Sequence, residues 1–323
     1  MPYNVINTIH YLTGEATEHL VGNGCTIRFC ELVEVELTPD QFCAEIQGVD
    51  AVIAGGERWS EKGFQAADRL KIVARSGSGY DQIDLEAATR HGVWVTNTPD
   101  ANSNAVADLT IGLILCLLRG IPAMLGDMKA GIWKQVRGKE LGSLTLGIVG
   151  AGRIGRQVAQ RARAFGARVL VYDVAPDEAF AARCQVEYAG LDRLFSSSDI
   201  VSLHCALNEQ TRGLVNQRLL GMMRREAYIV NTSRPAVIVR DDLVAALTSG
   251  RIAGAAIDVH DPRPSPDDPL VRLDNVLATP WVGSYTDAAC AAMVMTAAEE
   301  IVRVLRGDRP RFPVNRIPAL AHQ

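Results

Sequence analysis

Three glycines mark the stretch of the chain best suited to holding a phosphate group. In "LTLGIVGAGRIGRQVAQ", Gly150, Gly152 and Gly155 form a G-x-G-x-x-G pattern after an apolar run, and a helical pattern begins within it. A second apolar run, "RVLVY", follows and ends in Asp173. This order predicts a turn that approaches a pyrophosphate at a helix N-terminus, with Asp173 accepting from ribose hydroxyls. Because a carboxylate repels a 2′-phosphate and no basic residue follows immediately in "YDVAPDE", the pattern favours NAD over NADP.

A single cation stands at the end of another predicted strand. The segment "NTSRP" (231–235) follows the run "AYIV", which puts Arg234 at the C-terminal end of that strand. Ligands of open α/β sheets bind at such strand ends. Arg234 is therefore a candidate to bind a substrate carboxylate and to polarise a carbonyl group; a surface ion pair is the alternative.

A large aromatic residue stands at a third strand end. In "ATPWVGSYT" (278–286), Trp281 follows Thr279 and Pro280 and precedes a Gly-Ser-Tyr turn. A tryptophan in this setting can cap a hydrophobic core or form the wall of a site. Its indole N–H donates a hydrogen bond, but it does not shuttle a proton near neutral pH.

The elements that must position these residues follow an alternating pattern. From about residue 50, short β-rich runs alternate with helical stretches, which predicts an α/β fold with parallel sheets built from βαβ units. The stretch 104–131 is apolar on most sides and predicts a helix buried between domains or subunits, where a dimer interface would fit. A last helix is expected from about residue 286 to Gly307.

Length and composition limit the possible functions. A chain of 323 residues is long enough for two domains. The net charge is −4 and the basic residues are scattered, so we expect no nucleic-acid partner. The longest apolar run is too short to span a bilayer and the first residues do not form a targeting segment, so we expect a cytoplasmic protein without a membrane partner. Seven cysteines without a C-x-x-C pair predict reduced thiols and no metal site.

With these motifs in place, the chain resembles the D-2-hydroxyacid dehydrogenase family. The resemblance runs from about residue 50 to 310 and rests on "RSGSGYDQIDLEAATRHGVWVTNTPDANSNAVADLTIGL", the glycine pattern, "DIVSLHCALNEQTRGLV", "NTSRP", "SGRIAGAAIDV" and "DPLVRLDNVLATP". It implies a Rossmann NAD-binding domain at 101–285, inserted into a flavodoxin-like substrate domain at 1–100 and 286–323. It also implies a homodimer through the apolar region 104–131.

The resemblance further assigns roles to residues. It implies that Arg153 and Ile154 face the pyrophosphate, that Asp173 faces the adenosine ribose, and that Asp258 faces the nicotinamide amide. It puts Thr232, Ser233 and Arg234 on the nicotinamide side, and backbone groups around Ser78 and Gly79 at the acid group of the substrate.

The chain departs from the family where protons are transferred. The resemblance puts a histidine in a T-P-H-x-G turn and a glutamate five residues after the strand-end aspartate; this chain has Trp281 and Arg263 there. Pro235 and Val239 also replace a usual glycine and aspartate. Positioned acid/base catalysis is worth about 10²- to 10⁴-fold, so its loss would cripple ordinary 2-keto acid reduction.

Two histidines at predicted strand ends offer other proton routes. The chain has histidines at 10, 19, 91, 204, 260 and 322. Of these, we expect only His204 and His260 to face the ligand crevice. A packing or cofactor-contact role is preferred for His204. For His260, a catalytic role and a packing role are expected equally. Asp261 and Tyr285 are weaker candidates.

Three interpretations remain open. We favour an NAD-dependent dehydrogenase or reductase acting on CH–OH donors, with Arg234 anchoring a small anionic substrate and Arg263 binding a second anionic group such as a phosphate, phosphonate or carboxylate. Trp281 then shapes the substrate pocket. The second interpretation is a catalytically silent NAD(H)-binding sensor or assembly protein. The third is a conventional 2-hydroxyacid dehydrogenase whose proton comes from water.

Overall fold

The chain folds into two compact units. The computed structural model describes residues 2–9, 11–30 and 38–317. Met1–Asn102 and Tyr285–Gln323 make one unit, called here the outer unit, and Ser103–Ser284 make the inserted unit. Both contain parallel sheets with helices between the strands, so the predicted α/β class is confirmed. The boundaries expected near residues 100 and 285 lie close to this division.

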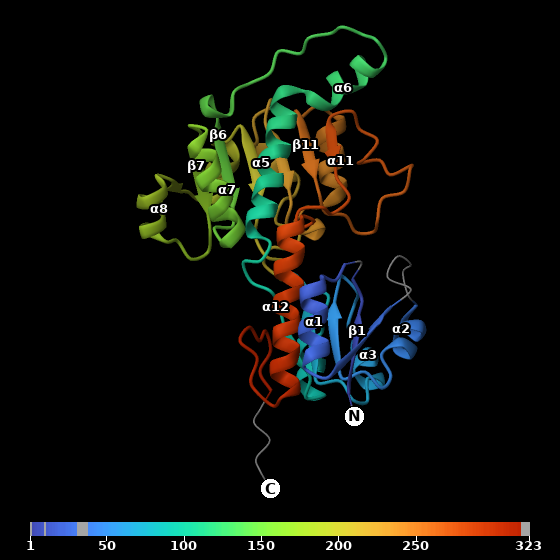
Figure 1. The fold of residues 1–323 in the computed structure, drawn as a ribbon. Helices are drawn as coiled ribbons and strands as arrows, with labels where there is room; N and C mark the ends of the chain where they lie inside the picture. The colour runs from blue at the N-terminus through green and yellow to red at the C-terminus, as the bar shows by residue number, and fades with distance from the viewer. Residues whose placement is uncertain (1, 10, 31–37, 318–323) are drawn as a thin grey trace. The chain divides into compact units, whose positions relative to one another are not determined.

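The outer unit is a three-layer α/β structure. Its strands run parallel in the order β2-β1-β3-β4-β5. Val52 and Val73 face a core shared with α2, α3 and α4, whereas Ile53 and Ile72 face a core shared with α1 and α12, which lie side by side in Figure 1. The bounds are β1 Tyr3–Asn7, α1 Gly14–Gly22, β2 Cys25–Phe29, α2 Pro39–Glu45, β3 Ala51–Ala54, α3 Glu61–Ala66, β4 Ile72–Arg75, α4 Leu85–Arg90, β5 Trp94–Thr96 and α12 Asp287–Leu305.

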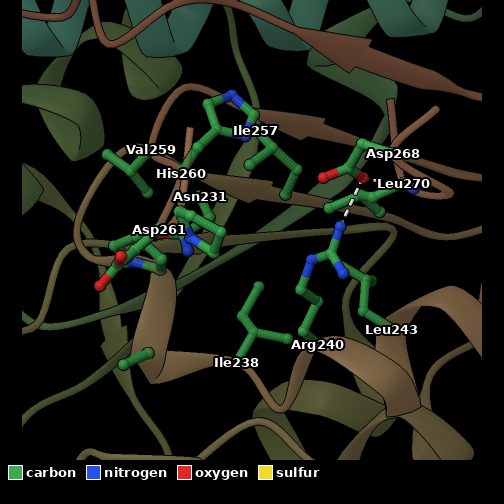
Figure 2. A pocket seen from close by; sticks show the side chains of 13 residues that line it. Asn231, Ile238, Arg240, Leu243, Ile257, Val259, His260, Asp261, Asp268 and Leu270 are labelled. Atoms are coloured by element: carbon green, nitrogen blue, oxygen red, sulfur yellow. Dashed lines mark hydrogen bonds and ion pairs between the residues drawn. The ribbon is translucent and has the colours of Figure 1, made fainter. Parts of the chain in front are cut away.

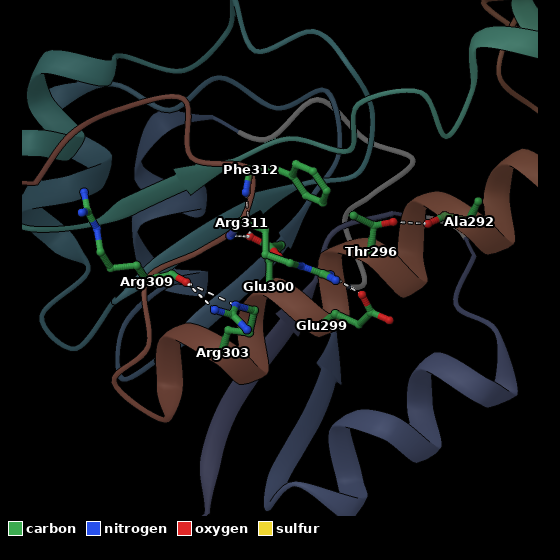
Figure 3. Close-up of polar contacts among 8 residues, drawn as sticks. All are labelled: Ala292, Thr296, Glu299, Glu300, Arg303, Arg309, Arg311 and Phe312. Atoms are coloured by element: carbon green, nitrogen blue, oxygen red, sulfur yellow. Dashed lines mark hydrogen bonds and ion pairs between the residues drawn. The ribbon is translucent and has the colours of Figure 1, made fainter.

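The segment after α12 covers the edge of this sheet. Asn315 accepts a hydrogen bond from the backbone N–H of Val95 and donates one to the carbonyl of Val93, both at 2.9 Å. Glu300 of α12 is fully buried and accepts from the backbone N–H and Nε of Arg311 and from the N–H of Phe312 (Figure 3). The buried carboxylate of Glu300 therefore joins Arg311 and Phe312 to helix α12.

The inserted unit contains the second sheet. Its parallel strands have the order β12-β11-β10-β9-β6-β7-β8. Strands β6 to β8 are added toward one edge of the sheet and β9 to β12 toward the other, so the strand order changes direction between β6 and β9. Ligands of such sheets bind at this switch point, outside the carboxyl ends of the strands. The bounds are β6 Thr145–Val149, α7 Arg153–Ala164, β7 Arg168–Tyr172, α8 Glu178–Cys184, β8 Glu187–Tyr188, α9 Leu191–Ser197, β9 Ile200–Leu203, α10 Gln217–Met222, β10 Tyr228–Asn231, α11 Arg240–Thr248, β11 Gly254–Ile257 and β12 Val276–Ala278. The 3₁₀ turns are η1 Leu141–Ser143 and η2 Pro235–Val237.

The apolar stretch 104–131 forms two helices instead of the single buried helix that its pattern predicts. Helix α5 (Ser103–Arg119) packs beside α7 on one face of the sheet (Figure 1), and eight of its residues are buried. Gly120 then adopts a left-handed conformation with φ +59°, and α6 (Ile121–Lys129) starts at an angle of 65° to α5 and buries no residue. Among the described residues, no single helix is long and apolar enough to cross a bilayer.

Candidate active site

The glycine pattern forms a tight turn at the end of β6. Gly150 has φ +99°, and a Cβ there would lie 2.6 Å from the backbone nitrogen of Cys205. A Cβ on Gly155 would overlap with the carbonyl oxygen of Gly150. Gly152 precedes α7 as its N-cap and has open space around its Cα, so a ligand can approach the backbone there. Turn and helix terminus therefore fit the pyrophosphate of a dinucleotide.

The first helical residues of this turn have different surroundings. Arg153 is exposed at the first position of α7. Ile154 is partly buried and packs against the core beneath the helix. The predicted contacts of both residues with a pyrophosphate stay predictions.

Asp173 stands directly after β7 and holds the same turn. Its Oδ2 accepts from the backbone N–H of Ala151 at 2.6 Å, and its Oδ1 accepts from that of Ala175 at 3.0 Å. The side chain is partly exposed, and a carboxylate has further lone pairs for ribose hydroxyls. One side chain thus supports the glycine turn and remains available to a ribose.

His204 follows β9 and lies behind the glycine turn. Its backbone N–H donates to the carbonyl of Val149, and its Nε2 lies 2.8 Å from Oγ of Ser202. Burial lowers the pKa of His204 to about 3. The ring is therefore neutral near pH 7, which agrees with the preference for packing or cofactor contact over proton donation.

Asn231 holds the loop that contains Arg234 through hydrogen bonds. This buried residue accepts from both the backbone N–H and the hydroxyl of Ser233, and its Nδ2 donates to the carbonyl of Arg234 at 2.9 Å. The hydroxyl of Thr232 lies 3.0 Å from that of Thr110 on α5. Nη1 of Arg234 donates to the carbonyl of Ser233 at 2.8 Å.

Asp258, at the end of β11, fixes the turn that contains Trp281. The residue is 1% exposed, and its carboxylate accepts from the hydroxyl of Thr279 and from the backbone N–H groups of Val282 and Gly283, at 2.6, 2.9 and 2.9 Å. The sequence assigned this side chain only to the nicotinamide amide. In the structure it also organises residues 279–283.

Trp281 lies against Arg234 and does not cap a core. The residue is 46% exposed, so the core-cap alternative is wrong. Its backbone has φ +58°, and its N–H donates to the carbonyl of Asp258 at 2.8 Å. The guanidinium carbon of Arg234 lies 5.8 Å from the ring centroid, within the range of a cation–π interaction.

His260 lines a cavity of about 130 Å³ beside this site (Figure 2). The cavity lies between the loops that follow β10 and β11, with Ile238, Leu243 and Ile257 among its apolar walls and an ion pair between Arg240 and Asp268 at one side. Nε2 of His260 lies 3.0 Å from the carbonyl oxygen of Thr279. Because a carbonyl only accepts, Nε2 is the donor.

Arg263 is exposed on the loop 260–270. Within the described ranges it forms neither a hydrogen bond nor an ion pair, and the structure shows no contact between it and Arg234. Two other histidines of the chain, His10 and His322, lie outside the described residues.

In the outer unit, Ser78 and Gly79 form a turn after β4. The hydroxyl of Ser78 donates to Oδ1 of Asn102 and its carbonyl accepts from Nδ2 of Asn97, both at 2.8 Å. The backbone N–H groups of Ser78 and Gly79 donate to no acceptor in the part of the chain that the structure describes. Adjacent N–H groups of this kind can receive an anion.

Arg75 is a residue that the sequence reasoning missed. It ends β4, and its guanidinium lies so close to Gly77 that a Cβ there would be 2.6 Å from Nη1. Gly77 has φ +143°, which favours glycine. The signal was present in "KIVARSG", where a basic residue ends an apolar run directly before the turn.

No group of three or more His, Cys, Asp or Glu side chains suited to a metal ion is found among residues 2–9, 11–30 and 38–317. The structure brings Arg234, Trp281, Asp258 and His260 together within the inserted unit. Ser78 and Gly79 belong to the outer unit.

Comparison with known proteins agrees with this arrangement. Residues 111–283 match the family model described as "D-isomer specific 2-hydroxyacid dehydrogenase, NAD binding domain". The chain is 40% identical over 260 residues to a glyoxylate reductase of Korarchaeum cryptofilum, which covers 78% of each chain. It is 39% identical over 293 residues to a D-3-phosphoglycerate dehydrogenase of Methanocaldococcus jannaschii, which covers 88% of this chain but only 56% of that protein.

A solved structure shares the whole fold. The TT0316 protein from Thermus thermophilus is similar with a TM-score of 0.87 and 34% identity, over 96% of this chain and 99% of that one.

Proposed function

The chain belongs to the D-isomer specific 2-hydroxyacid dehydrogenase family, and on this premise we propose that it exchanges a hydride between NAD and a small anionic hydroxy compound. The observation that carries the proposal is the arrangement at the carboxyl ends of the inserted sheet. A glycine turn held by Asp173 fits a dinucleotide there, and Arg234 supplies a cation on a neighbouring loop. The substrate class is a 2-hydroxy acid or an alcohol or aldehyde that bears a phosphate or phosphonate.

The cofactor supplies the hydride chemistry, and this chain binds and orients it. Gly150, Gly152 and Gly155 allow the backbone to approach the pyrophosphate, with Arg153 and Ile154 beside it. Asp173 accepts from the adenosine ribose and disfavours a 2′-phosphate. The further cofactor contacts that we propose come from His204, Thr232, Ser233 and Asp258.

Arg234 anchors the reacting end of the substrate. A guanidinium binds a carboxylate through two parallel N–H donors and polarises an adjacent carbonyl. The backbone N–H groups of Ser78 and Gly79, which have no acceptor among the described residues, provide donors for the acid group. Arg263, exposed on its loop, is our candidate to bind a second anionic group.

The proton at the substrate oxygen requires a group other than Trp281, because an indole does not shuttle protons near neutral pH. We propose His260. Its Nε2 donates to the carbonyl of Thr279, so Nδ1 is the ring atom that takes up or releases the proton. A catalytically silent NAD(H)-binding protein is the alternative, and the replacement of the acid/base pair by Trp281 and Arg263 favours it.

The assembly that we propose is a homodimer through the region 104–131. Helix α6 buries none of its side chains in the structure. The exposed apolar residues of α6 and of the segment after it are Ile121, Leu125, Met128, Ile132, Trp133 and Val136. Large exposed apolar residues gathered in one segment are typical of a protein–protein interface.

A substrate panel tests the function. Glyoxylate, hydroxypyruvate, phosphoglycerate, and phosphonate-bearing alcohols and aldehydes are assayed with NAD or NADH, and turnover is followed by nicotinamide absorbance. We expect turnover with at least one anionic compound and its loss in Arg234→Gln with NADH affinity retained. Clear NADH binding without turnover of any member of the panel would overturn the proposal in favour of the silent protein.

A further inference from the structure

We propose that Trp281 is a positioning residue for Arg234: its indole face holds the guanidinium so that an anion meets the N–H edge of that group. The proposal deepens the proposed function and rests on it only in taking Arg234 as the anion-binding group. It concerns two side chains of the inserted unit, joined at 5.8 Å between the guanidinium carbon and the ring centroid.

The backbone at Trp281 is held in an uncommon conformation. Its φ of +58° lies in the left-handed region, which bulky residues rarely adopt. Such a conformation persists only where the surrounding structure determines it, and such residues cluster at ligand sites. Trp281 is 46% exposed, so core packing does not account for this backbone. The turn therefore determines the direction of the indole ring.

Asp258 supplies the contacts that fix this direction. Its carboxylate accepts from Thr279 before the tryptophan and from Val282 and Gly283 after it, and its carbonyl accepts from the N–H of Trp281 itself. The buried Asp258 thus accepts four hydrogen bonds, from Trp281 itself and from residues on both sides of it. A Cβ on Gly283 would lie 3.0 Å from Oδ2 of Asp258, so the turn is also closely packed.

Two contacts within the inserted unit hold the guanidinium. Nη1 donates to the carbonyl of Ser233 in the plane of the group, and the indole lies within cation–π distance. A flexible arginine loses rotamer entropy when it binds an anion, and a guanidinium that is already held loses less of it. Trp281 therefore pre-organises Arg234.

This arrangement selects the shape of the ligand. A guanidinium binds a carboxylate through donors that lie in its own plane. Because the indole occupies a position beside the group, we infer that the preferred ligand is a planar carboxylate approaching the N–H edge, as in 2-hydroxy and 2-oxo acids. Oxalate, a planar dicarboxylate that accepts no hydride, is a suitable probe.

The test compares three full-length variants with the wild type. Oxalate and inorganic phosphate are titrated by calorimetry into each protein saturated with NADH, and NADH affinity is measured separately by fluorescence. Trp281→Leu removes the π face, Trp281→Phe keeps one, and Trp94→Leu is the matched control. Trp94 lies 5.9 Å from the guanidinium carbon of Arg309 in the outer unit, a similar pair at a different place.

We expect Trp281→Leu to bind oxalate about tenfold more weakly, within the range of a partly desolvated cation–π contact. Trp281→Phe should recover most of this loss, Trp94→Leu should bind oxalate normally, and NADH affinity should stay within about twofold of the wild type in all three. Oxalate binding by Trp281→Leu equal to that of the wild type overturns the proposal. So does a Phe variant as weak as the Leu variant, or a wild-type complex that binds neither anion.

The outcome is separate from that of the proposed function. If the wild type turns over no substrate but binds oxalate in a Trp281-dependent way, the positioning role stands and the enzymatic function fails. If turnover occurs and the oxalate affinity does not depend on Trp281, the enzymatic function stands and the positioning role fails.

Discussion

The carboxylate of Asp173 accepts a hydrogen bond of 2.6 Å from the backbone N–H of Ala151, inside the glycine turn. The residue expected to contact the ribose therefore also supports the backbone expected to contact the pyrophosphate. Two parts of a dinucleotide site thus depend on one side chain.

Replacing Asp173 by alanine should affect both parts at once. Because hydrogen bonds to a charged group contribute about 1.5–3 kcal/mol, we expect NADH to bind about ten- to a hundredfold more weakly and discrimination against NADPH to fall. Fluorescence titration with both cofactors measures this. Asp192→Ala is the control, since that carboxylate pairs with Arg218 and, within the described residues, makes no contact with the glycine turn. An unchanged preference for NADH would refute the ribose contact.

The partly buried His204 should make stability depend on pH. Its folded-state pKa, about 3, lies below the ordinary value of 6.5, so between these values the unfolded chain binds a proton that the folded chain does not. The free energy of unfolding contributed by this group therefore falls as pH decreases through that window, by at most about 1.4 kcal/mol per pH unit. The difference between wild type and His204→Gln, measured by urea denaturation at several pH values, should show this slope. Parallel curves would contradict it.

Two adjacent glutamates on α12 offer a matched test of burial (Figure 3). Both pair with Arg311, but Glu300 is fully buried with three hydrogen bonds, whereas Glu299 is partly exposed. Glu300→Ala leaves three partly buried donors without their acceptor and should lower the free energy of unfolding by about 3–5 kcal/mol. Glu299→Ala should lower it by less than about 1 kcal/mol. Equal losses in urea denaturation would show that burial does not set the difference.

The apolar surface of α6 predicts how the chain assembles. Leu125→Asp combined with Met128→Asp puts two charges on exposed positions, which is costly only if a second copy covers them. Sedimentation should show a dimer for the wild type and a monomer for this variant. Val21→Asp, at an exposed apolar position of α1, is the control and should sediment as the wild type does. A monomeric wild type would refute the homodimer.

The sequence predicted the elements whose signals are local. The alternating apolar runs from about residue 50 onward predicted parallel sheets, but β1 and β2, which lie before that residue, were missed. The spacing of Gly150, Gly152 and Gly155 before a helix predicted the turn that the structure contains. The bend at Gly120 was missed, because a single glycine in an apolar run also fits a continuous helix.

Features that depend on distant residues could not be predicted in the same way. Trp281 follows β12, but the residue that holds its left-handed backbone, Asp258, follows β11. The arginine that it contacts, Arg234, follows β10. Arg75 lies against Gly77 because of the local path of one turn, which the sequence pattern does not specify. The residue types were visible, but their contacts were not.

The replacement of the acid/base pair that we infer at Trp281 and Arg263 can be tested by reversing it. Arg263→Glu combined with Trp281→His introduces the two residue types that the resemblance implies, and the turn should accept the change because histidine tolerates a positive φ better than bulky residues do. Asp258 still holds the turn in this variant. Since positioned acid/base catalysis contributes about 10²- to 10⁴-fold, glyoxylate reduction followed by nicotinamide absorbance should rise by about 10²-fold or more.

Each single substitution is the control for the pair. The histidine alone lacks the carboxylate that orients it, and the glutamate alone has no imidazole to orient, so we expect each single variant to gain much less than the double variant. This non-additivity separates a restored acid/base pair from a general opening of the pocket, in which Trp281→His alone would account for the gain. A double variant that binds NADH as the wild type does and still fails to reduce glyoxylate would show that another difference, such as Pro235 or Val239 beside Arg234, sets the chemistry.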